Sequence, residues 1–100
     1  MLDLTESQQE LVKDLLKKYI PNTAVWAYGS RVKGTSTPKS DLDIAAFTHA
    51  EQKAGIINLR EAFEESNLPF RVDLFVWDEV PAAFRKNIER EHVVLQQQTP

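Results

Sequence analysis

Three aspartates in this 100-residue sequence are spaced so that they could share one patch of a β-sheet. Asp41 and Asp43 alternate with apolar residues in SDLDIAAF, and Asp73 lies in a second apolar stretch, FRVDLFVW. A carboxylate set into an apolar strand loses hydration that another partner must replace. That partner could be Lys or Arg, or it could be a divalent cation, since carboxylate oxygens are ligands that Mg²⁺ prefers.

The alternation of side chains along a β-strand predicts that the three carboxylates converge. If the apolar faces of segments 41–47 and 70–77 both pack against helices, then Asp41, Asp43 and Asp73 lie together on the opposite face. Close carboxylates repel one another and resist ionisation unless cations neutralise them. We therefore expect Mg²⁺ at this patch, with the remaining ligands supplied by substrate phosphates and water.

Gly29-Ser30 directly follows an expected strand and offers a phosphate-binding element. Glycine allows the backbone to approach a ligand closely, and the amides that follow can face an anion. The Ser30 hydroxyl can donate to a phosphate oxygen. The segment GSRVKGTS lacks the GKS/T ending of a Walker A loop. Arg31 and Lys33 are expected to be solvated, although either could contact a triphosphate.

The elements that must position these residues form one α/β layer structure. Apolar spacing, caps and prolines predict helices over 5–20, 51–66 and 78–91, the last capped by Asp78 or Glu79. Strands are predicted over 24–28, 41–47, 70–77 and 93–95, and loop 29–40 has room for one helical turn over 30–33. The tail 96–100 is expected to fray.

The length and composition limit the remaining possibilities. One domain over 1–100 is expected. With a net charge of −3 and basic residues scattered along the chain, no extended nucleic-acid track is visible. The absence of cysteine excludes disulfides and thiolate metal sites. No signal peptide or membrane span is expected, which favours the cytoplasm.

The stretch YGSRVKGTSTPKSDLDIAAF resembles the signature of the DNA polymerase β-type nucleotidyltransferase superfamily. That signature is an apolar residue, Gly-Ser, a spacer of roughly ten residues and then Asp-apolar-Asp-apolar. Gly29-Ser30 and Asp41-Leu42-Asp43-Ile44 match it, and Asp73 matches the third carboxylate, which the family carries on a later strand. The short length and the element order resemble the minimal (MNT) branch, so the resemblance covers the whole chain.

The resemblance implies a nucleotidyltransferase fold, in which a small mixed β-sheet has helices packed mainly on one face. It implies an enzyme with two Mg²⁺ ions, replaceable by Mn²⁺, held by the three aspartates. Gly29, Ser30 and Arg31 would bind a nucleoside triphosphate, expected to be ATP. An acceptor hydroxyl would attack the α-phosphorus, with Asp73 nearer the acceptor. Members of the minimal branch are antitoxins that transfer AMP to a tyrosine of a HEPN toxin partner.

Other interpretations stay open at this point. The protein could neutralise a partner by binding alone, or it could modify a small molecule or an RNA end. Asp43 could be a structural ion-pair partner of Arg71, and Asp73 could pair with Arg71 or Arg31. An aspartate-nucleophile phosphatase is excluded, because there the apolar strand precedes the first aspartate. Apolar side chains near the carboxylates predict a docking surface for a protein partner: Phe47, Phe75 and Trp77. His49 and His92 are assigned no role.

Overall fold

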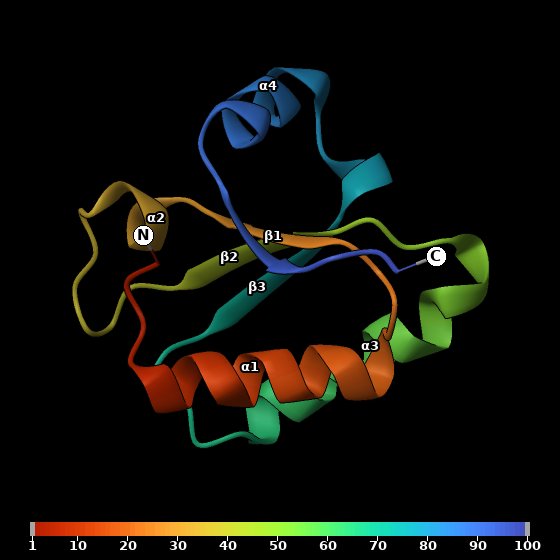
Figure 1. Cartoon of the computed structure of the whole chain (residues 1–100), viewed down its shortest axis with the longest axis horizontal. Helices are drawn as coiled ribbons and strands as arrows, with labels where there is room; N and C mark the ends of the chain where they lie inside the picture. Colours follow the sequence, from red (N-terminus) through yellow and green to blue (C-terminus); the bar gives the residue numbers. More distant parts are fainter. Residues whose placement is uncertain (1, 100) are drawn as a thin grey trace.

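A four-stranded mixed sheet forms the centre of the computed structural model, which describes residues 2–99 (Figure 1). The strands run in the order β3-β2-β1-β4, with β2 and β3 parallel and the other neighbours antiparallel. The elements in chain order are α1 (Glu6–Tyr19), β1 (Val25–Tyr28), α2 (Ser30–Lys33), β2 (Leu42–Ala46), η1 (Ala50–Gln52), α3 (Lys53–Glu65), β3 (Val72–Val76), η2 (Trp77–Glu79), α4 (Ala82–Arg90) and β4 (Val93–Gln96). The expected mixed sheet and the order of elements are confirmed.

Helices α1 and α3 lie side by side on one face of the sheet (Figure 1). Helix α1 begins with the predicted capping box, in which Thr5 and Gln8 satisfy each other's backbone amides. Gly55, a weak helix former, lies where α3 meets the end of α1: a Cβ there would be 2.5 Å from the Tyr19 carbonyl oxygen. The glycine therefore permits the close approach of the two helices.

The hydrophobic core lies between these helices and the sheet. Leu42, Ile44 and Leu74 point into it from β2 and β3, as the alternation predicted. The opposite face of the same strands carries the aspartates. Of the helices in residues 2–99, none is long and apolar enough to cross a membrane.

Helix α4 packs on the other face of the sheet, above the aspartates' side (Figure 1). It begins at Ala82 with Pro81 as its N-cap, so the predicted start at Asp78 or Glu79 is wrong. The residue before a proline is disfavoured in the α region, and Val80 is accordingly extended, which separates the η2 turn from the helix.

Aromatic rings attach α4 and its exit to the sheet. His92, for which no role was expected, stacks on Trp26 at 3.8 Å between ring centroids, and its Nδ1 lies 2.9 Å from the Ile88 carbonyl oxygen. The guanidinium of Arg85 donates to the carbonyls of Trp77 and Asp78. These contacts fix the position of α4 relative to the strands that carry the aspartates.

Gln96, the last residue of β4, holds the end of this strand against the connection between α1 and β1. Its side chain donates to the carbonyls of Ile20 and Thr23, both at 2.8 Å, and Thr99 hydrogen-bonds with Asn22. The expectation that the tail frays is therefore wrong for Gln96 and stays a prediction for the residues after it. Pro100 lies outside the described residues.

Candidate active site

One row of side chains crosses three neighbouring strands. Tyr28 lies opposite Asp43 in the β1–β2 pair, and Asp43 lies opposite Asp73 in the β2–β3 pair. Asp41 is one row away on the same face, just before β2 begins. The predicted convergence of Asp43 and Asp73 is confirmed. It follows from equal register on two parallel strands, which brings residues of the same face together.

Gly29 lies between the end of β1 and helix α2, directly against this row. Its backbone has φ +83° and ψ −155°, a conformation that is essentially restricted to glycine. A Cβ at this position would lie 2.6 Å from Oδ2 of Asp43. Ser30 then begins the single turn of α2, which ends at Gly34 as predicted. Gly29 of the Gly-Ser pair is therefore in contact with Asp43 on β2.

Asp43 has an unusual electrostatic environment. Burial, together with the neighbouring carboxylates Asp73 and Asp41, raises its pKa to about 6, although Arg71 acts in the opposite direction. Within residues 2–99 no side chain forms an ion pair or hydrogen bond with the Asp43 carboxylate. The structural ion pair considered for Asp43 is therefore not formed. Burial, together with the carboxylates of Asp43 and Asp73, also raises the pKa of Tyr28 to about 12.

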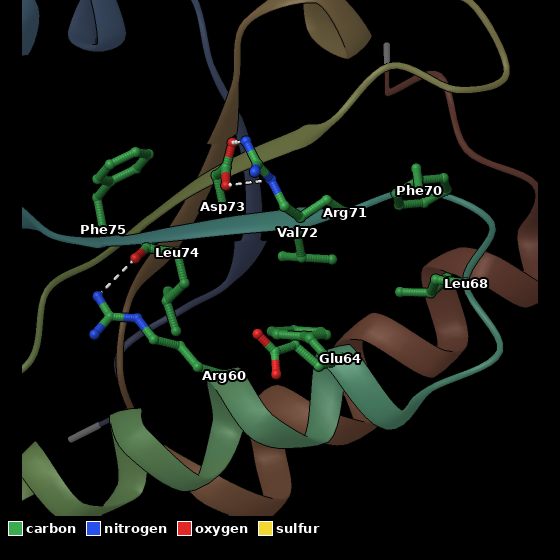
Figure 2. Close-up of a pocket in the computed structure, with 10 residues that line it drawn as sticks. Arg60, Glu64, Leu68, Phe70, Arg71, Val72, Asp73, Leu74 and Phe75 are labelled. Carbon is green, nitrogen blue, oxygen red and sulfur yellow. Dashed lines mark hydrogen bonds and ion pairs between the residues drawn. The ribbon is translucent and has the colours of Figure 1, made fainter.

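Arg71 neutralises the other two aspartates. Its guanidinium lies 3.1 Å from Asp41 Oδ2 and 3.0 Å from Asp73 Oδ1. Figure 2 shows Arg71, Asp73 and Phe75 on one side of β3, with Val72 and Leu74 on the other side facing α3. The carboxylates in turn raise the pKa of Arg71, Asp41 most strongly. The pairing of Asp73 with Arg71, considered as an alternative role, is thus present.

The donor set fits a hard divalent cation. Among residues 2–99 no cationic side chain pairs with the carboxylate oxygens of Asp43. Burial and the neighbouring carboxylates raise the pKa of Asp43, and a bound cation would oppose this shift. Within the described chain no three His, Cys, Asp or Glu side chains are gathered as a ready-made metal site. Asp41 and Asp73 instead form ion pairs with Arg71. Its side chain is 70% exposed and can leave without breaking the core.

Arg31 differs most from its expected place. It is only 4% exposed, so the expectation of a solvated side chain is wrong. Its guanidinium lies over the Phe70 ring at 4.0 Å and donates to four backbone carbonyls, those of Asp3, Thr37, Pro38 and Ser40. Arg31 therefore holds the loop that leads into the aspartate motif against the N-terminal segment.

The chain matches a known protein family over most of its length. The family model described as polymerase beta, nucleotidyltransferase, matches residues 10–100. The chain belongs to this nucleotidyltransferase family. The match includes Gly29-Ser30 and all three aspartates, which are the residues that carry the sequence resemblance.

A curated member of this group from Haemophilus influenzae is 40% identical over 99 residues, covering 96% of this chain and 85% of that protein. It is described as a probable protein adenylyltransferase, MntA. A toxin–antitoxin crystal structure with AMP-PNP contains a chain with a TM-score of 0.67, at 20% identity and with 93% of this chain and 74% of that chain covered.

A second solved structure holds a tri-AMPylated Shewanella oneidensis HEPN toxin in complex with an MNT antitoxin. Its similar chain has a TM-score of 0.50 at 16% identity, with 89% of this chain and 72% of that chain covered. At these identities the two solved structures support the nucleotidyltransferase fold of this chain.

Sequence reasoning missed several members of the site and its surroundings. Tyr28 shares the row of the aspartates, and its alternation with the apolar Val25 and Ala27, which face the core, was the signal that could have placed it there. Phe47 and Trp77 pack on each other with ring centroids 4.6 Å apart. Of the three aromatic residues in the predicted docking surface, one is an exposed ring. Phe75 is 44% exposed, and Phe84 of α4, which was not considered, is 60% exposed.

Proposed function

We propose that this nucleotidyltransferase is a protein adenylyltransferase that transfers AMP from ATP to a tyrosine hydroxyl of a HEPN toxin partner, and so acts as its antitoxin. One observation carries the proposal: Gly29, just after β1, lies against Asp43 of β2, and Asp43 is in register with Asp73 of β3. The relative at 40% identity, itself described as a protein adenylyltransferase, supports the choice of reaction.

Asp41, Asp43 and Asp73 would hold two Mg²⁺ ions, for which Mn²⁺ could substitute. When bound, these ions would neutralise the charge on the α-phosphate and on the attacking and leaving oxygens. Gly29 contributes close backbone approach and Ser30 a hydroxyl donor, which together would hold the β- and γ-phosphates. Arg31 acts here through the loop it fixes, because its donors are already bonded to carbonyls.

The acceptor oxygen forms a bond to the α-phosphorus while the bond to the β-phosphate oxygen breaks, and pyrophosphate leaves. Asp73 lies on the outermost of the three strands, at an edge of the sheet that a protein acceptor can reach. In the proposed reaction it takes up the proton of the acceptor hydroxyl. Catalysis then consists mainly of positioning and charge neutralisation. We place this ATP-consuming reaction in the cytoplasm.

Incubation with ATP, Mg²⁺ and a HEPN-type partner protein tests the proposal. The partner should gain one or more AMP units by intact-mass spectrometry and lose toxicity. Asp43→Ala should abolish the mass shift but leave the complex intact on size-exclusion chromatography. Full neutralisation by Asp43→Ala would show that binding alone is the function, and AMP found only on a small molecule or RNA would contradict the protein acceptor.

A further inference from the structure

A cavity of about 370 Å³ opens directly beside Asp43, between the sheet and α4. Polar groups from Tyr28, Asp43 and Glu79 line it, and its remaining wall is apolar, made of Phe75, Val80, Pro81 and Phe84. Phe75 and Phe84 are two of only four large hydrophobic side chains exposed within residues 2–99. Exposed apolar rings concentrated beside a polar site indicate a place where a ligand or partner binds.

The row of site residues sets the direction of the proposed reaction. In a displacement at phosphorus, the attacking and leaving oxygens are in line. Gly29, next to the proposed β- and γ-phosphates, lies at the end of β1, while Asp43 and Asp73 follow on β2 and β3. Pyrophosphate therefore leaves toward β1, and the acceptor arrives from the open edge at β3.

A second cavity lies at that edge of the sheet. It has a volume of about 440 Å³ and lies mainly between β3 and α3, and the residues of the aspartate face that border it are Arg71, Asp73 and Phe75 (Figure 2). The line through phosphorus thus has a binding element at one end and the open edge of the sheet at the other. The remaining large substituent of the α-phosphorus is the nucleoside, whose oxygen is perpendicular to this line, so that the base can lie in either direction along the strands.

Only one of the two sideways directions offers an apolar cavity. Toward the start of β2 lie Asp41 and the exposed Arg71, which form an ion pair at 3.1 Å and present charged groups rather than an apolar wall. Toward α4 lies the cavity with the two phenylalanines. Aromatic side chains bind nucleobases by stacking, with little preference for the base.

We infer that the cavity between the aspartate face and α4 binds the base of the nucleoside triphosphate, with Phe84 and Phe75 as the residues that contact its ring. This assignment rests on the proposed function, since the phosphates at Gly29-Ser30 define the axis. Phe75 borders both cavities, so it also separates the base from the incoming acceptor. Phe84 borders only the base cavity and is the residue to test.

The test compares calorimetric binding of Mg·ATP and of Mg·tripolyphosphate, which has the phosphates but no base. Phe84→Ala should weaken ATP binding by about tenfold, the usual effect of losing one stacking ring. Its tripolyphosphate binding should be unchanged. Phe84→Trp should keep ATP affinity. The matched control is Ile57→Ala, which removes a 55% exposed apolar side chain from α3. It should change the affinity for neither ligand.

Two results would overturn the inference. The first is an ATP affinity in Phe84→Ala equal to that of the unaltered protein; if the KM for the protein acceptor is then raised, the cavity belongs to the acceptor tyrosine. The second is an equal loss of affinity for ATP and tripolyphosphate. If the unaltered protein binds neither ligand in the presence of Mg²⁺, the proposed nucleotidyltransferase function itself has failed.

Discussion

Gly29 and Asp43 lie so close together that the Asp43 carboxylate occupies the space that a side chain at position 29 would need. A Cβ at Gly29 would lie 2.6 Å from Asp43 Oδ2, and the backbone there has a conformation that other residues avoid. The Gly-Ser pair of the motif therefore has two requirements at one position, a special backbone conformation and space for a carboxylate. This contact joins the two halves of the sequence motif.

Gly29→Ala should lose both stability and activity. We expect a loss of about 1–3 kcal/mol in the free energy of unfolding, measured by urea denaturation, because the backbone is strained. The matched control is Gly34→Ala, which also has positive φ, +80°, but has open space around its Cβ. Gly34→Ala should lose stability alone. Retention of AMP transfer by Gly29→Ala would contradict the role given to this contact.

The Asp43 carboxyl should make the stability of the metal-free protein depend on pH. Its pKa is raised from 3.8 to about 6, so the folded state binds a proton more tightly than the unfolded state. Stability is therefore lost as the pH rises from about 4 to about 6, and the penalty persists above that range. Asp43→Asn removes the penalty, so in EDTA at pH 7.5 its Tm should exceed that of the unaltered protein.

That difference in Tm should shrink toward zero as the pH is lowered through 6 to 4. Thermal melts of Asp43→Asn and of Asp41→Asn, over this pH series, provide the measurement and its control. Asp41 already pairs with Arg71, so its neutralisation should bring no gain at pH 7.5. A lower Tm for Asp43→Asn than for the unaltered protein at pH 7.5 would mean that Asp43 has a structural partner.

Arg71 should compete with divalent metal for Asp41 and Asp73. Both ion pairs are short, but the arginine is largely exposed, so the competition is modest. In Arg71→Ala, Mn²⁺ measured by calorimetry without nucleotide should bind about two- to fivefold more tightly. Lys33→Ala removes an exposed positive charge outside the aspartate cluster and is the control. Weaker Mn²⁺ binding in Arg71→Ala would show that the arginine supports the metal site instead.

Much of the site follows from the two-residue period of a strand. That period predicted Asp43 and Asp73 on a shared face, since both core faces are marked by apolar residues. The single turn at 30–33 and its end at Gly34 followed from local signals. Local signals also indicate the start of α4, because Pro81 disfavours the helical conformation of the residue before it. The predicted cap at Asp78 or Glu79 neglects this effect.

The burial of Arg31 could not be predicted in this way. Arginine is mostly exposed in proteins, and here its partners are backbone carbonyls, which any residue type supplies. The stack of His92 on Trp26 likewise depends on where α4 returns the chain to the sheet. Such contacts join segments far apart in sequence, and neither residue type nor spacing indicates them.

Arg31→Ala should therefore destabilise the fold, although the residue directly follows the Gly29-Ser30 pair. Its removal leaves several carbonyls without donors, and we expect a loss of about 3 kcal/mol in the free energy of unfolding. Arg31→Lys should restore only part of this stability, since an ammonium group cannot reproduce the planar fork of donors of a guanidinium. Lys33→Ala should be near neutral. A stable Arg31→Ala with reduced ATP affinity would instead support direct contact with the phosphates.

The most direct test of the central claim is the fate of the two ends of ATP. Incubated with Mg²⁺ and the HEPN partner, ATP labelled at the α-phosphate should label the partner, whereas ATP labelled at the γ-phosphate should not. Asp43→Ala should lose the α-label, and pyrophosphate should appear in the amount of AMP transferred. Label from the γ-phosphate on the partner, or undiminished α-label in Asp43→Ala, would contradict nucleotidyl transfer at this row of aspartates.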